Sequence, residues 1–201
     1  MRDVKVAILL FDGVEELDWA GPWEVLTMWA ALARRRDEAA VTVHLVGGTS
    51  GPIRCAKGAR LLADLTWDEL EGTPDIVVVP GGRGTRQLVE DAALLARLRS
   101  LHENGALLAS VCTGSLLLAA AGLLEHRPAT THHGALGELQ GLDGSCEVRR
   151  DERYVDDGDI VTSAGVSAGI DMALHLVDRF AGTERARAVR AAIQYDPEPP
   201  V

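Results

Sequence analysis

Four short segments typical of strands divide the chain, and helix-like segments lie between them. Val4–Phe11, Asp75–Pro80 and Ala106–Val111 are almost uninterrupted apolar runs, and Val41–Val46 is a further strand that includes Thr42 and His44. Strands with so few polar positions are buried on both faces, which is typical of a parallel sheet covered by helices on its two sides. The alternation of such strands with helices predicts an α/β fold, a three-layer sandwich around a mostly parallel central sheet.

The segments between and after these runs carry helical spacing or turn signals. Helices are expected at Gly21–Arg35, Leu88–His102, Ser115–Ala121, Ser167–Phe180 and Glu184–Gln194. Hairpins are expected at 53–62 and at 153–162, where Lys-Gly and Asp-Asp-Gly mark the turns. Thr66-Trp-Asp-Glu69 has the pattern of a capping box, which predicts that a short helix starts there.

Size and charge set further limits. The 201 residues suit a single domain (1–201), and 47% apolar content excludes a disordered chain. A net charge of −10 argues against nucleic acid and anionic membranes as partners, because both attract basic surfaces. The longest apolar stretch, Leu116–Leu124, is too short to span a membrane, and the N-terminus has no export signal. Three cysteines without a CxxC pair suit a reducing cytoplasm, which is the expected location.

Three loops follow strand ends and contain the residues that are candidates for catalysis or binding. They are Asp12–Gly21, Gly81–Arg86 and Cys112–Gly114. In a parallel α/β sheet, ligands bind beyond the carboxyl ends of the strands. The sequence therefore predicts that these loops meet in one site.

Cys112 is the expected nucleophile. Ser110-Val-Cys-Thr-Gly114 joins a buried strand directly to a helix, and small residues on both sides of Cys112 allow a sharp elbow. A thiol at a helix N-terminus is stabilised as the thiolate, so Cys112 is expected to be substantially ionised at neutral pH. The alternative is a buried structural cysteine, which is the favoured interpretation of Cys55 and Cys146.

Asp18 is the expected acid/base partner. It lies between Leu17 and Trp19, where a carboxylate is costly without a partner or a task, and a neighbouring thiolate would raise its pKa. A helix cap is an equally good interpretation of this residue. Gly81 and Gly82 follow a strand and can offer N–H groups to an anion, together with the N–H of Thr113, although an ordinary turn has the same pattern.

The histidine pair and the tryptophans receive weaker interpretations. His132 and His133 lack the further ligands that a metal site needs, so a structural or pocket-lining role is favoured and no metal is expected. Trp19, Trp23 and Trp29 suit packing in the core or at a subunit interface better than a ligand wall.

Taken together, these residues resemble the ThiJ/PfpI superfamily, whose members share a class I glutamine amidotransferase-like domain of flavodoxin type. Among its families the chain is most similar to the isonitrile (isocyanide) hydratases. The motifs that carry the resemblance are Phe11-Asp-Gly-Val-Glu-Glu-Leu-Asp-Trp-Ala-Gly-Pro22, Val79-Pro-Gly-Gly82, Ser110-Val-Cys-Thr-Gly-Ser-Leu116, Ala129-Thr-Thr-His132, Thr162-Ser-Ala-Gly-Val-Ser-Ala-Gly-Ile-Asp171 and Tyr195-Asp-Pro-Glu-Pro-Pro200.

The resemblance implies a nucleophile elbow at Cys112, a facing acid at Asp18, and Thr113 beside the nucleophile. It also implies oxyanion donors at Gly81 and Gly82 and a homodimer, and it places His132 at the substrate. Two departures separate the chain from other branches. The protease-like members have histidine where Thr113 stands, and the chaperone, glyoxalase and deglycase members usually have glutamate where Asp18 stands.

The expected activity is that of a hydro-lyase that converts an isonitrile to an N-formamide. Cys112 would attack the isonitrile carbon while Asp18 delivers a proton, and water would then release the formamide from a thioimidate. This chemistry requires no metal or organic cofactor, and its partner is a small electrophile. The alternatives are a glyoxalase or deglycase acting on 2-oxoaldehydes, and a non-enzymatic sensor of redox state or of a small ligand.

Overall fold

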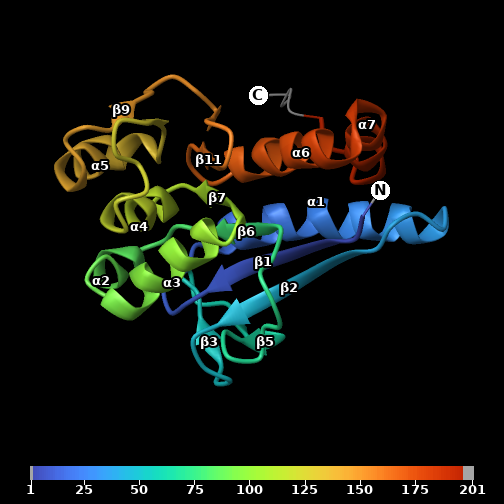
Figure 1. Cartoon of the computed structure of the whole chain (residues 1–201), viewed down its shortest axis with the longest axis horizontal. Coiled ribbons are helices and arrows are strands. Elements are labelled where there is room, and N and C mark those ends of the chain that lie inside the picture. The colour runs from blue at the N-terminus through green and yellow to red at the C-terminus, as the bar shows by residue number, and fades with distance from the viewer. Residues whose placement is uncertain (1, 197–201) are drawn as a thin grey trace.

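A seven-stranded sheet forms the centre of the molecule, as seen in a computed structural model that describes residues 2–196 (Figure 1). Its strand order is β10-β11-β7-β6-β1-β2-β5, and β10 is the antiparallel member while the other pairings are parallel. The strands are β1 (Val4–Leu10), β2 (Val41–Gly47), β5 (Leu65–Thr66), β6 (Ile76–Val79), β7 (Leu107–Val111), β10 (Tyr154–Asp156) and β11 (Ile160–Ser163). The predicted α/β fold is confirmed.

Helices flank this sheet in two groups. The helices are α1 (Glu16–Arg35), α2 (Thr85–Leu88), α3 (Ala92–Glu103), α4 (Gly114–Ala120), α5 (Leu136–Leu142), α6 (Ala168–Ala181) and α7 (Thr183–Ala192), with a 3₁₀ turn, η1 (His133–Ala135), before α5. Helices α1, α6 and α7 pack on one another, and α4 joins α2, α3 and α5 into the second group (Figure 1). No helix within residues 2–196 is both long and apolar enough to cross a membrane.

Both predicted hairpins are present. The first pairs β3 (Ile53–Arg54) with β4 (Arg60–Leu61), and the second is formed by β10 and β11. A separate two-stranded sheet pairs β8 (Pro128–Ala129) with β9 (Glu147–Val148). The end of the last motif, from residue 197 onward, lies outside the described residues.

Helix α1 begins earlier than the sequence predicts. Gly21-Pro22 was expected to open this helix, but the helix starts at Glu16 and Pro22 lies inside it. Proline lacks the N–H that would bond to the carbonyl four residues before it, so an interior position carries a cost. Burial of Pro22, whose Cγ would lie 3.4 Å from a Cβ on Gly169 of α6, offsets that cost by packing. The consequence for the site is that Asp18 lies in the first helical turn.

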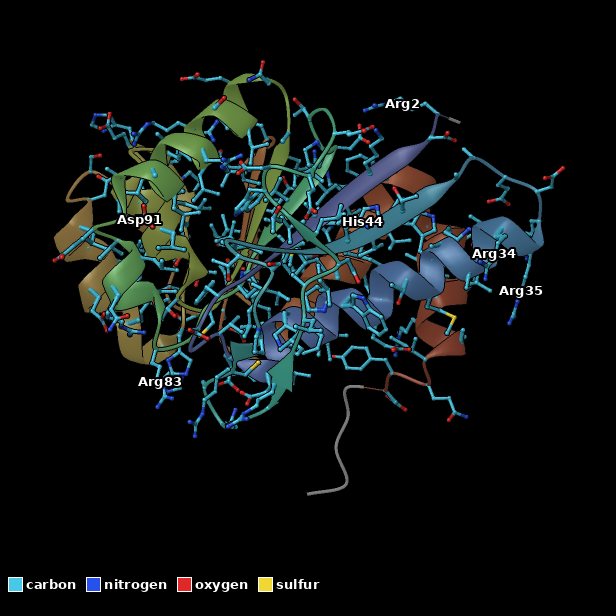
Figure 2. The ribbon with its side chains drawn as sticks, turned by 90° about the horizontal axis from the view of Figure 1, so that it is seen from below. Arg2, Arg34, Arg35, His44, Arg83 and Asp91 are labelled. Carbon is cyan, nitrogen blue, oxygen red and sulfur yellow. The ribbon has the colours of Figure 1, made fainter. Side chains whose placement is uncertain are left out.

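Two local predictions from the sequence are wrong. Strands β1 and β2 are not covered on both faces along their whole length, because Lys5 and Thr42 near their amino ends are exposed; Figure 2 shows His44 on the same stretch of β2. Only half of the capping box forms: the Glu69 carboxylate accepts from the N–H of Thr66 at 2.8 Å, but the N–H of Glu69 donates to the Thr66 carbonyl and not to its hydroxyl, and the chain continues as a turn and not as a helix.

Candidate active site

The loops after β1 and β6 are bonded to each other at the carboxyl edge of the sheet. Val14 and Gly82 form an isolated antiparallel bridge, and the N–H of Glu15 donates to the carbonyl of Gly81 at 2.9 Å. Strands β1, β6 and β7 are neighbours in the sheet, so the loop after β7 reaches the same place. The predicted convergence of the three loops is therefore observed.

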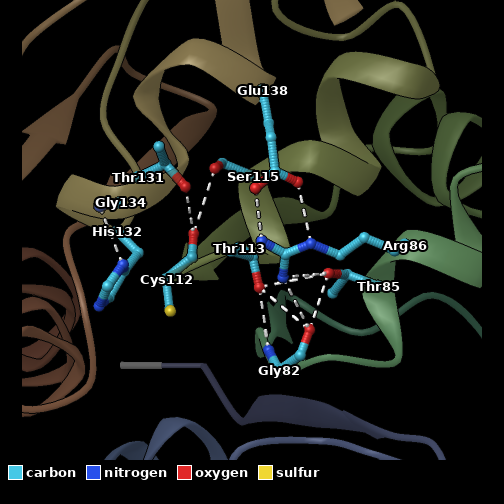
Figure 3. Close-up of polar contacts among 10 residues, drawn as sticks. All are labelled: Gly82, Thr85, Arg86, Cys112, Thr113, Ser115, Thr131, His132, Gly134 and Glu138. Carbon is cyan, nitrogen blue, oxygen red and sulfur yellow. Dashed lines mark hydrogen bonds and ion pairs between the residues drawn. The ribbon is translucent and has the colours of Figure 1, made fainter.

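Cys112 occupies a strained elbow between β7 and α4. Its φ angle is 56°, a left-handed conformation that a residue with a Cβ rarely adopts. The N–H of Cys112 is shared between the carbonyls of Ser163 and Ala164, each at 3.1 Å. Its carbonyl accepts hydrogen bonds from the Thr131 hydroxyl at 2.9 Å and the Ser115 hydroxyl at 3.2 Å (Figure 3). Four hydrogen bonds thus hold Cys112 in a conformation that an isolated chain would leave.

Gly114 explains why the elbow needs small residues. A Cβ at this position would lie 2.0 Å from the carbonyl oxygen of Val79, the last residue of β6. No side chain fits there, so a residue other than glycine would push the start of α4 away from the sheet.

Asp18 is fully buried and faces this elbow. Its Oδ2 accepts a hydrogen bond from the N–H of Gly81 at 3.0 Å, and Oδ1 is buried without a hydrogen-bond partner among the described residues. Burial raises the pKa of Asp18 to about 7, although the Gly81 N–H and the Cys112 thiol both favour the charged form. The helix-cap alternative is not observed, because Glu15 is the N-cap residue of α1.

The expectation that Cys112 is largely a thiolate at neutral pH is wrong for this arrangement. Burial and the negative charge of Asp18 raise the pKa of the Cys112 thiol to about 12. The backbone N–H groups of Thr113 and Val166 donate to the sulfur and lower the pKa, but by less than burial raises it. A thiolate can form here when Asp18 takes up the proton.

The two predicted oxyanion donors at Gly81 and Gly82 are engaged within the protein. The N–H of Gly81 bonds to Asp18, and the N–H of Gly82 donates to Oγ1 of Thr113 at 3.0 Å. The N–H groups that face the sulfur are those of Thr113 and Val166. The Thr113 hydroxyl itself is bound to Gly82 and lies 3.2 Å from the Thr85 hydroxyl (Figure 3).

His132 lies at the same site in a defined tautomer. Its Nδ1 accepts a hydrogen bond from the N–H of Gly134 at 3.1 Å, so the neutral ring carries its proton on Nε2. Burial and the nearby charges of His133 and Arg86 lower the pKa of His132, which favours this neutral form. The ring lies against Gly165, where a Cβ would stand 2.4 Å from Cδ2. His132 can therefore offer one N–H donor.

The remaining candidates from the sequence lie elsewhere or serve packing. Trp29 is buried in the core, whereas Trp19 and Trp23 are half-buried against it. Cys55 and Cys146 are free, buried thiols whose pKa is raised mainly by burial. Within residues 2–196, no three His, Cys, Asp or Glu side chains gather as metal ligands.

Several residues of the site were not singled out from the sequence. They are Thr85, Ser115, Thr131 and Val166. The three hydroxyl residues are buried, and nothing in their local sequence distinguishes them from the many exposed serines and threonines. Val166 acts through its backbone and has a φ angle of 49°, which only the folded chain reveals.

The chain is an α/β domain of the class that carries a cysteine at a strand-to-helix elbow. In this chain the cysteine has a left-handed backbone conformation and faces a buried carboxyl group. The model of the DJ-1/PfpI family matches residues 4–179, and the chain belongs to that family.

Individual relatives agree with this assignment. An isonitrile hydratase of Pseudomonas putida is 38% identical over 197 residues, covering 98% of this chain and 81% of that protein. A glutathione-independent glyoxalase of Caenorhabditis elegans is 28% identical over 148 residues, covering 73% of this chain and 77% of that protein. The crystal structure of a ThiJ/PfpI family protein from Pseudomonas syringae superposes with a TM-score of 0.88 at 28% identity, covering 100% of this chain and 78% of that one.

Proposed function

We propose that this protein hydrates an isonitrile to an N-formamide, with Cys112 as nucleophile and Asp18 as general acid and base. The similarity to the isonitrile hydratase of Pseudomonas putida, which extends over 98% of the chain, supports the reaction. The identity of the carboxylate also supports it, because the chain has aspartate where the glyoxalase branch usually has glutamate.

One observation carries the proposal: a carboxyl group with a pKa of about 7 lies against the thiol of the elbow. Moving the thiol proton to Asp18 leaves the net charge of the pair unchanged and produces a nucleophile and an acid together. An isonitrile carbon needs both, since it must gain a sulfur and a proton. Oδ1 of Asp18 has no protein partner among residues 2–196, so it is the oxygen that can hold this proton.

The steps balance with the pair alone. The thiolate of Cys112 forms a C–S bond to the isonitrile carbon, and Asp18 gives its proton to that carbon, which yields a thioimidate, R–N=CH–S. Water then adds: Asp18 takes a proton from the water and passes it to the nitrogen while the oxygen bonds to carbon. Finally the C–S bond breaks, the hydroxyl proton returns to Asp18, and the formamide leaves the regenerated thiolate.

Three N–H groups can stabilise charge during these steps. The backbone N–H groups of Thr113 and Val166 face the sulfur, and each therefore stabilises the thiolate before attack and after release. The Nε2–H of neutral His132 is a third donor, suited to the substrate nitrogen. In this proposal these three groups are the oxyanion donors, a role that the sequence analysis gave to Gly81 and Gly82. The N–H groups of the two glycines instead position Asp18 and Thr113.

A glyoxalase activity is the second candidate, supported by the 28% identity to the Caenorhabditis elegans glyoxalase. It predicts lactate from methylglyoxal. A redox sensor is less well supported, because fast oxidation requires an exposed thiolate. Cys112 is 6% exposed and its pKa is raised.

Infrared loss of the isonitrile stretch, with the formamide identified by mass spectrometry, tests the proposal on the purified protein. We expect turnover that is lost in Cys112→Ser and falls at least ~100-fold in Asp18→Asn, since general acid–base catalysis contributes about that much. Cys146→Ser is the matched control, because Cys146 is another buried free thiol and lies outside the site, and it should retain activity. Near-normal turnover in Asp18→Asn would remove the role assigned to that residue.

A further inference from the structure

We propose that Thr85 is a positioning residue of the active site: its buried hydroxyl locks Gly82 so that the adjoining Gly81 amide stays aimed at Asp18. The inference deepens the proposed function, since it rests on Asp18 as the acid/base group. Thr85 touches neither Asp18 nor Cys112 in any hydrogen bond and would act through the loop between them.

The contacts of Thr85 form a closed ring of hydrogen bonds. Its hydroxyl donates to the carbonyl of Gly82 at 2.8 Å and lies 3.2 Å from the hydroxyl of Thr113 (Figure 3). The N–H of Gly82 donates to Oγ1 of Thr113 at 3.0 Å. A hydroxyl has one proton, so Thr85 gives its proton to Gly82 at the shorter contact and accepts from Thr113. Both backbone groups of Gly82 are thereby held.

Gly81 and Gly82 need such an external restraint. Two consecutive glycines have the largest conformational freedom that a chain offers, and Gly82 has a φ angle of 125°, which a residue with a Cβ would avoid. The space is also narrow, because a Cβ on Gly81 would lie 2.5 Å from the Thr113 nitrogen and 2.9 Å from Oδ2 of Asp18. Glycine is required by the fit but does not itself keep the loop in place. Backbone contacts hold part of the loop, since the carbonyl of Gly81 accepts from the N–H of Glu15 at 2.9 Å and Val14 forms a bridge with Gly82, and the hydroxyl ring adds a buried side-chain restraint on Gly82.

Arg86, on the surface, makes a further contact with the carbonyl of Gly82. Nη1 of Arg86 lies 3.3 Å from the Gly82 carbonyl, and the guanidinium is held by both carboxylate oxygens of Glu138 at 2.9 and 2.7 Å. The side chains of this ion pair are almost half exposed, so its contribution is screened by solvent. Thr85 is fully buried, and its shorter bond is the stronger restraint.

The consequence for Asp18 is electrostatic. The Gly81 N–H favours the charged carboxylate and opposes the effect of burial. If the loop relaxes, this hydrogen bond lengthens and the pKa of Asp18 rises. The proton then rests on Asp18 more often than in the unmodified protein, which increases the small fraction of thiolate within the pair.

The test follows the rate of Cys112 alkylation by iodoacetamide against pH, read by peptide mass spectrometry. This readout depends on the Asp18–Cys112 pair and not on any substrate, so it stays informative even if no isonitrile is turned over. In Thr85→Val we expect the midpoint of the first rise to move up by about 0.5 pH unit, with a higher plateau rate. Thr85→Ser, which keeps the hydroxyl, should restore the midpoint of the unmodified protein.

Ser110→Ala is the matched control, because the Ser110 hydroxyl is buried and has no hydrogen-bond partner within residues 2–196. Its midpoint should not move. Cys55 and Cys146 report folding in the same experiment, since both are buried and stay unmodified in a folded chain. Arg86→Met, a surface change, should shift the midpoint in the same direction by less. An unshifted midpoint in folded Thr85→Val would overturn the proposal, as would unshifted Arg86→Met if Thr85→Val does not fold.

Discussion

The carboxyl group of Asp18, in the first turn of α1, lies against the thiol of Cys112, which follows β7. A hydrogen bond joins the two side chains, and a negative charge on Asp18 makes ionisation of the thiol less favourable. Burial raises the pKa of Asp18 to about 7, and burial together with Asp18 raises that of Cys112 to about 12. At neutral pH the pair therefore holds at least one proton, and the position of that proton decides whether the site is reactive.

The first prediction concerns stability. Asp18 has a pKa of 3.8 in an unfolded chain and about 7 when folded, so the folded state holds a proton that the unfolded state releases between these values. Stability contributed by this group is therefore complete below about pH 4 and falls as the pH rises to 7, by about 4 kcal/mol at most. Asp18→Asn removes this loss, and we expect it to melt ~5 °C or more above the unmodified protein at pH 8.

Thermal melts at pH 4 and pH 8 check this prediction. At pH 4 the melting temperatures should lie closer together than at pH 8, because Asp18 is then neutral in the folded chain and only partly ionised in the unfolded chain, near its pKa of 3.8. A variant that is less stable than the unmodified protein at pH 8 would show that the carboxylate is not destabilising in the fold. The prediction also implies that Asp18→Asn, the variant that the proposed function expects to lose activity, is the more stable one, as expected where a functional group is held at a cost.

The second prediction concerns the thiol. The negative charge of Asp18 raises the pKa of Cys112, so Asp18→Asn should lower the pKa of Cys112 below about 12 while burial keeps it above that of a free thiol. The alkylation rate of Cys112 between pH 8 and pH 10 measures the change. Cys55, which lies outside this pair, should show the same protection in both proteins. A Cys112 profile that is identical with and without the carboxylate would contradict the coupling.

The third prediction concerns the fit at Gly81. A Cβ there would lie 2.5 Å from the Thr113 nitrogen, a distance at which something must shift. We expect Gly81→Ala to displace Asp18 from the thiol and to lower activity ~100-fold, with a loss of about 1–3 kcal/mol in stability. Gly48→Ala is the control, since nothing lies within 4 Å of its Cβ, and both its activity and its melting temperature should be unchanged.

The fourth prediction concerns the hairpin that leads to Val166. Asp156 of β10 accepts from His175 at 2.6 Å and from Arg179 at 2.9 Å, and these partners lower the pKa of Asp156. A lowered pKa stabilises the fold above the unfolded value of 3.8, and the stability is lost as the pH falls through the folded value. Asp156→Asn should therefore cost about 1 kcal/mol at pH 7, and less towards pH 3. Chemical denaturation at the two pH values measures both.

A largely exposed ion pair provides the comparison. Glu184 and Arg187 pair at 2.8 Å on α7 with both side chains mostly in solvent, so Glu184→Gln should leave stability unchanged. If Asp156→Asn and Glu184→Gln change the free energy of unfolding by the same amount, the partly buried charges around Asp156 do not stabilise the hairpin.

The elbow, the parallel sheet and both hairpins were predictable from the sequence because their signals are local. Small residues around Cys112 and the long apolar runs need no partner elsewhere to be interpreted. The start of α1 was not predictable in this way. Pro22 is a local signal for the first turn of a helix, but α1 begins at Glu16, and Pro22 lies inside it, where it packs against Gly169 of α6. Thr66 and Glu69 form one of the two hydrogen bonds of a capping box, and this single bond does not start a helix where the chain turns away.

By itself, the sequence determined the fold class, the position of Cys112 between a strand and a helix, and the three loops that meet beside it, because periodicity and chain topology bring strand ends to one edge. The tertiary structure alone decided the protonation of the pair and the donors around it. A pKa depends on how much water the fold removes and on which amides point at the charge. For this reason the pKa of Cys112, expected to be lowered by its place at a helix start, is instead raised to about 12 by burial and by the charge of Asp18.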